Sequence, residues 1–175
     1  MRSLAGLAAS ARPAPALDSL VHPVPLAALT LMLLNDHVLK ASDPGWLTGK
    51  LSDVAGLMLL PFVLLAGWEV VRLARPGLPA AGPRLAIASV IVAILAFTAV
   101  EVMPIGSDLY RLGMGGAQLP FRALAALVAS EPLPGLAPVQ VTSDLSDLLT
   151  LPAALMVLAV RPWRDLAPFR TTWLR

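Results

Sequence analysis

The chain has 175 residues and a formal net charge of +2; 57% of its residues are hydrophobic and only 14% are charged. A soluble domain is about a quarter charged, so this composition excludes a soluble enzyme, a nucleic-acid-binding protein and a disordered tail. The chain contains no cysteine, which excludes disulfides, thiolate zinc sites and cysteine nucleophiles. The class that remains is an integral membrane protein.

Long apolar stretches predict the fold. A helix that crosses the bilayer needs about 20 mostly apolar residues. Four stretches come close to this length and predict an all-α integral membrane protein, a four-transmembrane-helix bundle with spans at about residues 23–40, 51–73, 85–103 and 145–161. A weaker apolar run at 121–130 is too short to span and predicts an interfacial or re-entrant segment. The GMGG sequence at 113–116 predicts a flexible turn before it.

Basic residues predict the orientation, because cytoplasmic segments of membrane proteins carry an excess of Lys and Arg. With the N-terminus in the cytoplasm, nine of the thirteen basic residues lie inside, namely Arg2, Arg12, Arg72, Arg75, Arg84, Arg161, Arg164, Arg170 and Arg175. Residues 1–22 then form a cytoplasmic lead-in and residues 162–175 a basic cytoplasmic tail. The Ala-, Leu-, Pro- and Arg-rich usage favours a bacterium, so the expected location is the bacterial inner membrane, with both termini cytoplasmic.

Acidic residues show the opposite bias and lie at the outer ends of the predicted spans. Asp36 ends the first span, Asp53 opens the second, and Glu101 ends the third. Asp144 and Asp147 open the fourth span. A charge costs roughly 2.5–3.5 kcal/mol at the centre of a membrane helix and less toward the interface. Four spans with an acid at one depth therefore predict a shared polar pocket in which one carboxyl group from each span converges.

A short internal repeat supports this pocket. The Leu-Ser-Asp sequence at 51–53 recurs at 145–147, and each copy follows a span that ends in an acid. This pattern suggests two parallel helical hairpins related by an axis along the membrane normal.

Structural explanations for the same residues stay open. Asp36 and Lys40, at positions i and i+4, form a favourable pair on a helix surface. Asp53 and Asp147 fall in predicted first turns, where an acid caps free N–H groups and complements the helix dipole. His37 fits a polar anchor at the interface as well as a general base or metal ligand.

A pocket of this composition suits two kinds of chemistry. In the first, carboxylates and an imidazole move a proton, and the catalytic candidates are Asp36, His37, Asp53 and Glu101. Lys50 and Arg111 are then the candidates for binding the phosphate of a lipid or wall precursor. In the second, the pocket holds a divalent cation as a cofactor, with Asp53, Asp144 and Asp147 as the candidate ligands.

Three short motifs resemble those of VanZ-like membrane proteins. The sequence from Lys50 to Val54 resembles their lysine-x-x-histidine-phenylalanine motif, with Asp53 in place of the histidine. The sequence from Glu101 to Pro104 resembles their glutamate-x-x-glutamine, with proline in place of the glutamine, and Asp144 to Asp147 resembles their aspartate-x-x-aspartate. The resemblance covers about 60 residues in spans two to four. It implies a role in the cell envelope, since VanZ-like proteins are associated with glycopeptide resistance, but no defined reaction.

The resulting hypothesis is a small bacterial inner-membrane protein with an outward-facing pocket rich in acids and containing His37. The pocket would bind or act on an envelope lipid or a divalent cation. The alternatives are a non-catalytic subunit or scaffold of a larger membrane complex and a small dimeric transporter. The expected partners are membrane lipids and either further copies of the chain or a larger complex, with no nucleic acid.

Overall fold

The computed structural model describes residues 19–75 and 77–160, and every element in these two ranges is helical. The lead-in up to residue 18 and the predicted tail at 162–175 lie outside the described residues. The elements are α-helices, one π-helical turn (η2) and one 3₁₀-helix (η3). Their order is α1 (Pro23–Leu34), η2 (Asn35–Leu39), α2 (Lys40–Ser42), α3 (Trp46–Ala74), α4 (Pro83–Val102), α5 (Pro104–Ala129), η3 (Leu145–Leu155) and α6 (Met156–Val160).

The first long helix is continuous from α1 through α2, with one π-helical turn, η2, inside it. It begins at Pro23, where the missing N–H of proline costs nothing, and the side chain of His22 accepts a hydrogen bond from the N–H of Val24. A π turn adds one residue to the helical repeat and is common at functional sites. Here it includes Asn35 and Asp36.

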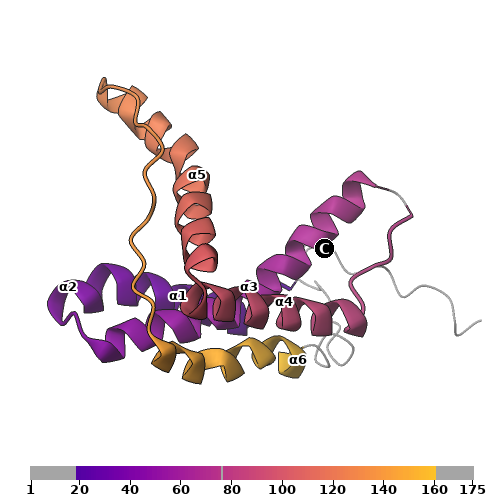
Figure 1. Ribbon diagram of the computed structural model, residues 1–175. Helices are drawn as coiled ribbons and strands as arrows, with labels where there is room; N and C mark the ends of the chain where they lie inside the picture. Colours follow the sequence, from indigo (N-terminus) through magenta and orange to yellow (C-terminus); the bar gives the residue numbers. More distant parts are fainter. Residues whose placement is uncertain (1–18, 76, 161–175) are drawn as a thin grey trace, which may run out of the picture.

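The second long helix, α3, begins five residues earlier than the predicted span. The N–H of Gly45 donates to the hydroxyl of Thr48, an N-terminal capping contact that starts the helix at Trp46. Asp53 therefore lies in the second turn, so the suggestion that it caps the helix is wrong. Pro61 lies inside α3, and the part of α3 that follows it turns away from α4 in Figure 1.

The core lies where α1, α3, α4 and the continuous segment η3–α6 pack side by side, with each running opposite to the one before it (Figure 1). Its largest buried side chains are Leu57 and Phe62 of α3 and Val157 of α6. Ala86, Ala93 and Ala154 have no exposed surface at all, because small side chains let neighbouring helices approach closely. This packing brings the end of α1–α2, the start of α3, the end of α4 and the start of η3 to one end of the molecule, called the polar end below.

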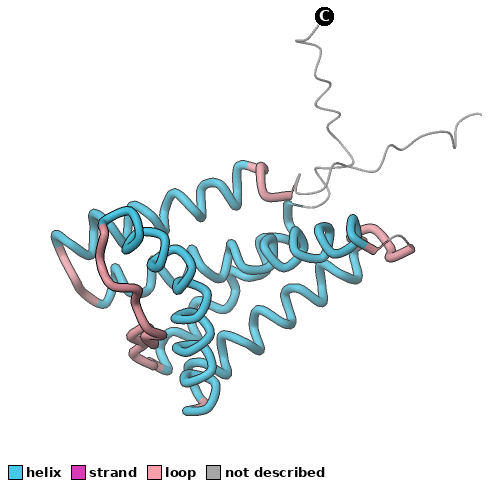
Figure 2. Tube along the Cα trace, turned by 90° about the horizontal axis from the view of Figure 1, so that it is seen from above, coloured by secondary structure: helices cyan, strands magenta, loops and turns pink. Residues whose placement is uncertain are grey.

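The region 104–144 differs most from the prediction. Residues 113–116 are not a turn, and 121–130 is not a separate segment; both belong to the single 26-residue helix α5, apart from Ser130, which caps it. Only Met103 separates α5 from α4, and α5 runs across the direction of α4 and α6 (Figure 1). The segment 131–144 then returns along α5, as the pink loop beside it in Figure 2 shows. Together α5 and residues 131–139 are called the arm below.

Four helices among the described residues are long and apolar enough to cross a membrane: Pro23–Ser42, Trp46–Ala74, Pro83–Val102 and Pro104–Ala129. The number agrees with the prediction, but the fourth member differs, because Leu145–Val160 is a shorter apolar helix. Its first 11 residues form the 3₁₀-helix η3, which rises about 2.0 Å per residue instead of 1.5 Å. Residues 145–160 are consequently about 30 Å long, as long as an α-helix of 20 residues.

Candidate functional site

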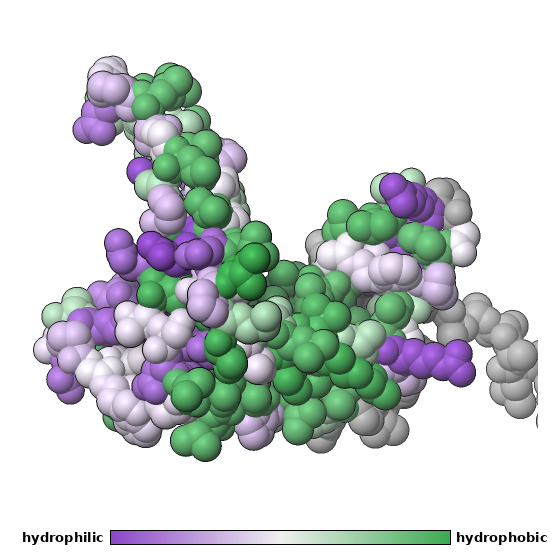
Figure 3. Space-filling view, viewed as in Figure 1, coloured by the Kyte–Doolittle hydropathy of each residue, from purple (hydrophilic) through white to green (hydrophobic). Residues whose placement is uncertain are grey.

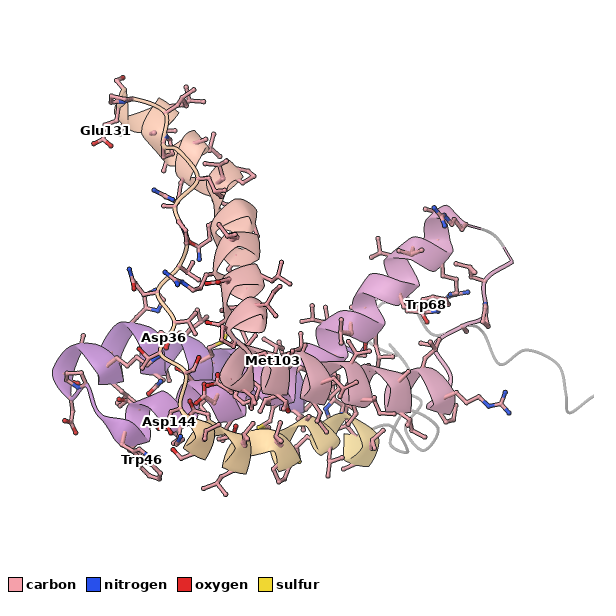
Figure 4. All side chains as sticks on the ribbon, viewed as in Figure 1. Asp36, Trp46, Trp68, Met103, Glu131 and Asp144 are labelled. Carbon is pink, nitrogen blue, oxygen red and sulfur yellow. The ribbon has the colours of Figure 1, made fainter. Side chains whose placement is uncertain are left out.

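The polar end carries a cluster of charged side chains from three elements. Lys50 and Asp53 come from the first two turns of α3, and Glu101 comes from the last turn of α4. The remaining members belong to the start of η3, namely Asp144, Ser146 and Asp147. These six residues are called the Lys50 centre below. Figure 4 shows Asp144 and Asp36 at this end of the molecule and Trp68 at the opposite end.

Lys50 is the cation of the cluster, and its side chain is only 9% exposed. Its Nζ forms an ion pair with Asp147, donates to the hydroxyl of Ser146 at 2.6 Å and lies 3.6 Å from a carboxylate oxygen of Asp144. The same ammonium lies 5.6 Å from the ring centroid of Trp46, close enough for a cation–π contact. A lysine this well covered is costly unless it is paired, so these contacts explain how Lys50 is tolerated there.

Asp144 is the N-cap of η3. Its carboxylate accepts hydrogen bonds from the N–H and the hydroxyl of Ser146, both at 2.8 Å. These two hydrogen bonds, the first being the stronger influence, hold the pKa of the Asp144 carboxyl below its ordinary value of 3.8. The charged form of Asp144 thus both starts η3 and faces Lys50.

Glu101 joins α4 to the start of η3. One of its carboxylate oxygens accepts the N–H of Asp144 at 2.9 Å, and the hydroxyl of Ser143 donates to the carbonyl of Val100. Asp53 lies one turn after Lys50 on α3, within electrostatic range of Asp147, Glu101 and Lys50. Two carboxylates, those of Asp144 and Asp147, thus contact the Lys50 ammonium, and those of Asp53 and Glu101 lie within electrostatic range of it.

A second polar cluster lies between the π turn and α3. Asn35 is fully buried and donates its two amide hydrogens to the carbonyl of Thr48 at 2.6 Å and the hydroxyl of Ser52 at 2.8 Å. Ser52 donates to Asp36, which also pairs with Lys40 at 2.8 Å. The carbonyl oxygen of the Asn35 side chain accepts no hydrogen bond from any described residue.

The structure separates the predicted site residues into three groups. Lys50, Asp53, Glu101, Asp144 and Asp147 come together in the Lys50 centre. Asp36 belongs to the Asn35 cluster, so only three of the four carboxyl groups expected to converge do so. His37, the next residue in the chain, is exposed, and its Nδ1 contacts the carbonyl of Leu33 one turn earlier. Arg111 lies on the arm, where it contacts Asp108 at 3.5 Å and the carbonyl of Val139 at 3.3 Å.

Two residues of these clusters were missed by sequence reasoning. Ser146 was not among the predicted site residues, yet it is a direct partner of Lys50. Asn35 was not among them either, yet it is the polar residue with the least exposed surface in the described chain. An asparagine inside an apolar stretch is itself a signal, because a buried amide needs hydrogen-bond partners from another element.

The geometry around Lys50 bears on the expected metal ligands. Among residues 19–75 and 77–160, no group of three or more His, Asp or Glu side chains is arranged so that it could hold a metal ion. The Lys50 ammonium lies between Asp144 and Asp147, in the place that a cation bound by these two carboxylates would take.

A cavity of about 320 Å³ opens beside Glu101, where α4 meets α5. Its lining combines two carboxylates, two hydroxyls and an apolar wall: Glu101, Val102, Met103, Pro104, Ser107, Asp108 and Ser143. Glu101 thus belongs both to this cavity and to the Lys50 centre, so a ligand in the cavity contacts the centre through one side chain. In Figure 3, hydrophilic residues gather at the polar end and at the base of the arm, whereas hydrophobic residues dominate the middle of the same face.

No protein-family model, no curated protein and no solved structure matches this chain. Functional inference therefore rests on the geometry of the Lys50 centre and of the cavity beside it. The two observations that matter most are the excess of carboxyl groups and the position of Glu101 in both places.

Proposed function

We propose that this chain is a small bacterial inner-membrane protein that binds the headgroup of an envelope lipid at the outer surface of the membrane. Three crossings correspond to Pro23–Ser42, Trp46–Ala74 and Pro83–Val102, and the fourth to residues 145–160. The length of about 30 Å that the 3₁₀ geometry gives this last segment matches the hydrocarbon core of a bilayer. The exposed apolar side chains on the middle of α4 support the same assignment, among them Ile87, Ile91 and Leu95.

The bias of basic residues toward the predicted cytoplasmic segments supports an orientation in which the polar end faces outward. The Lys50 centre and the cavity then lie at the depth where the headgroups of the outer leaflet begin. An ionisable residue in a membrane segment indicates a functional site when its partners come from other helices, as those of Lys50 do.

The observation that carries the proposal is the cavity beside Glu101. Its two carboxylates, Glu101 and Asp108, attract a positively charged group, and the hydroxyls of Ser107 and Ser143 supply hydrogen-bonding capacity. Its apolar wall, with Val102 and Met103, suits the glycerol and upper acyl part of a lipid. The favoured ligand is therefore a lipid whose headgroup carries a primary amine, and the resemblance to VanZ-like proteins agrees with a ligand from the envelope.

Binding is better supported than catalysis or ion coordination. His37, the expected general base, lies outside the Lys50 centre and contacts a backbone carbonyl of its own helix. A divalent cation is disfavoured because the Lys50 ammonium already lies between Asp144 and Asp147. A lipid amine in the cavity instead balances the carboxyl groups that Lys50 leaves uncompensated.

The test is lipid binding by the purified protein in detergent, followed by native mass spectrometry. Short-chain phosphatidylethanolamine and phosphatidylglycerol are the two lipids, and Glu101→Gln and Glu131→Gln are the variants. Glu131 follows α5 at the far end of the arm and lines no part of the cavity, so it is the matched control (Figure 4). We expect the amine lipid to bind at least about tenfold more tightly, a difference of roughly 1.4 kcal/mol, and only Glu101→Gln to abolish the preference.

Other results would contradict the proposal. Equal binding of the two lipids, or an amine preference that survives Glu101→Gln, excludes the cavity as the headgroup site. Free phosphoethanolamine, added as a competitor, distinguishes a site for the headgroup alone from one that also needs the acyl chains. Tight binding of Mg²⁺ that is lost in Glu101→Gln would favour the divalent cation instead.

A further inference from the structure

The arm combines a long amphipathic helix with a segment that covers one side of it. On α5, Ser107, Arg111, Gln118 and Arg122 fall on one side, given 3.6 residues per turn. The returning segment lies against this half of the helix: the N–H of Val139 donates to the carbonyl of Arg111, and Arg111 donates to the carbonyl of Val139. The polar side of α5 therefore has its partner within the chain.

A glycine on α5 allows the returning segment to lie this close. A Cβ atom at Gly115 would lie 2.3 Å from the carbonyl oxygen of Ala137, which is backbone and cannot move aside easily. Gly106 plays the same part at the base of the arm, where a Cβ atom would lie 2.2 Å from the carbonyl oxygen of Ala99 in α4. The contact at Gly106 holds the arm across the end of α4, and the contact at Gly115 sets which side of α5 the returning segment covers.

The opposite side of α5 is broad, apolar and uncovered. Its large side chains are 47–66% exposed, namely Ile105, Leu109, Leu112, Leu124 and Leu127. Among the described helices, α5 packs chiefly against α4, and this contact involves its first turns. Five large apolar side chains along about 33 Å of helix form a surface that water solvates poorly.

Three observations identify what covers this surface. The arm starts one residue after α4, so its base lies at the membrane–water boundary if α4 crosses the membrane. The arm runs across the direction of α4 and α6 (Figure 1), so it lies along the membrane plane if α4 crosses the membrane. Arg111 and Arg122 on its polar side match the pattern of interfacial helices, whose basic residues contact lipid phosphates while apolar residues enter the acyl region.

We infer that α5 is a membrane-surface helix that lies in the outer leaflet with its Ile105–Leu109–Leu112 side buried among lipid chains, although its hydropathy alone is high enough for a span. The occupant of the apolar surface is the lipid bilayer itself. This arrangement holds the cavity beside Glu101 at the level of the headgroups. The inference rests on the membrane assignment of α4 but not on the identity of any headgroup.

Single-cysteine labelling tests this inference directly, because the native chain has no cysteine. A nitroxide is placed at Leu109, Leu112, Leu124 or Leu127 on the apolar side, at Gln118 on the polar side, and at Ile91 on α4 as a deep reference. The full-length protein is reconstituted in vesicles of phosphatidylethanolamine and phosphatidylglycerol. Collisions with oxygen and with a water-soluble nickel chelate then report the depth of each label.

We expect the four leucine positions to lie roughly 5–10 Å below the headgroups along the whole of α5, with Gln118 in water. A depth that increases toward the middle of α5 on both sides would mean that α5 crosses the membrane. Labels shielded from both collision partners would mean that a second copy covers the surface. Either result overturns the inference, as would free access of the chelate to the leucine positions.

A charge placed on each side provides the matched pair of variants. Leu124→Glu is expected to move a label at Leu127 out of the lipid, because it places a carboxylate in the apolar surface. Gln118→Glu, on the polar side of the same helix, is expected to leave that label at its original depth. An equal effect of the two substitutions would contradict the assignment of the sides.

Discussion

The ammonium group of Lys50 pairs with the carboxylate of Asp147, 97 residues further along the chain, and this ion pair joins α3 to η3 at the polar end. Both side chains are largely buried, at 9% and 13% exposure. Lys50 also compensates the charge of Asp144, so one lysine stabilises the meeting point of two elements.

Removal of Lys50 alone should destabilise the protein more than removal of the pair. Lys50→Met leaves Asp53, Glu101 and Asp147 close together without a cation, whereas Lys50→Met combined with Asp147→Leu removes one of these charges as well. We expect the double variant to unfold at a higher temperature than Lys50→Met, as measured by thermal unfolding in detergent. Lys40→Met is the control, because the exposed Lys40–Asp36 pair contributes no more than about 1 kcal/mol. A double variant less stable than Lys50→Met would contradict the prediction.

The buried amide of Asn35 is expected to stabilise the protein through the two hydrogen bonds that its NH2 group donates. Asn35→Ala is expected to lower the free energy of unfolding by about 1–3 kcal/mol, because the hydroxyl of Ser52 loses a buried donor. Asn35→Asp should cost more, since a carboxylate there donates no hydrogen bond and faces the carbonyl of Thr48. Thr30→Ala, which removes an exposed hydroxyl on the same helix, is the control. Chemical unfolding in detergent measures all three variants, and equal stability of Asn35→Ala and Asn35→Asp would refute the proposed role of the amide.

The close approach of α5 to α4 requires glycine at position 106. Gly106→Ala is expected to destabilise the protein by about 1–3 kcal/mol and to displace the base of the arm, since its Cβ atom meets the carbonyl of Ala99. Gly113→Ala introduces the same group into α5 at a position with no atom within 4 Å, so it should be neutral or slightly stabilising. Limited proteolysis of residues 131–144 and thermal unfolding report the two effects. Similar behaviour of the two variants would show that the contact at Gly106 does not hold the arm.

The Asp144 carboxyl should give the protein a specific loss of stability in acid. Its pKa is lower in the folded protein than the ordinary value of 3.8, so the unfolded chain binds more protons at this position. Its stabilising contribution is complete above about pH 5 and is lost as the pH falls through the lowered pKa. Asp144→Asn keeps an N-cap acceptor but has no proton to gain at low pH.

We therefore expect the stability advantage of the unmodified protein over Asp144→Asn to shrink as the pH falls from about 5 to about 3. Thermal unfolding of both proteins across this range gives the difference directly, because their other carboxyl groups are the same. A difference that stays constant with pH would show that Asp144 is not stabilised in its charged form.

The positions of the apolar helices were predictable, because each is a local property of about 20 consecutive residues. The helices at Pro23–Ser42 and Pro83–Val102 agree with the predicted spans within a few residues. The start of α3 was predicted five residues late, although Gly45 and Thr48 carry a recognisable capping pattern. The length of α5 was missed because Gly113, Gly115 and Gly116 weaken helix propensity, which the packing of the arm overrides.

The candidate site was predictable in its composition but not in its pairing. Lys50, Asp53, Glu101, Asp144 and Asp147 were all singled out from the sequence, because each is a charge at the end of an apolar stretch. Their separation from Asp36 and His37 depends on which side of α3 faces η3 and which faces the π turn. One residue more or less in a helical turn rotates a side chain by about 100°, so this choice is set by packing.

The sequence by itself determined the helical class, the location of the long apolar segments and the gathering of acids at one end. These properties depend on local hydropathy and on charges near the ends of helices. Only the tertiary structure decided that Lys50 pairs with Asp147, that a 3₁₀-helix extends residues 145–160, and that α5 lies across α4. Each of these depends on contacts between different helices, whose free energy is set by close packing and by the partners available to buried polar groups.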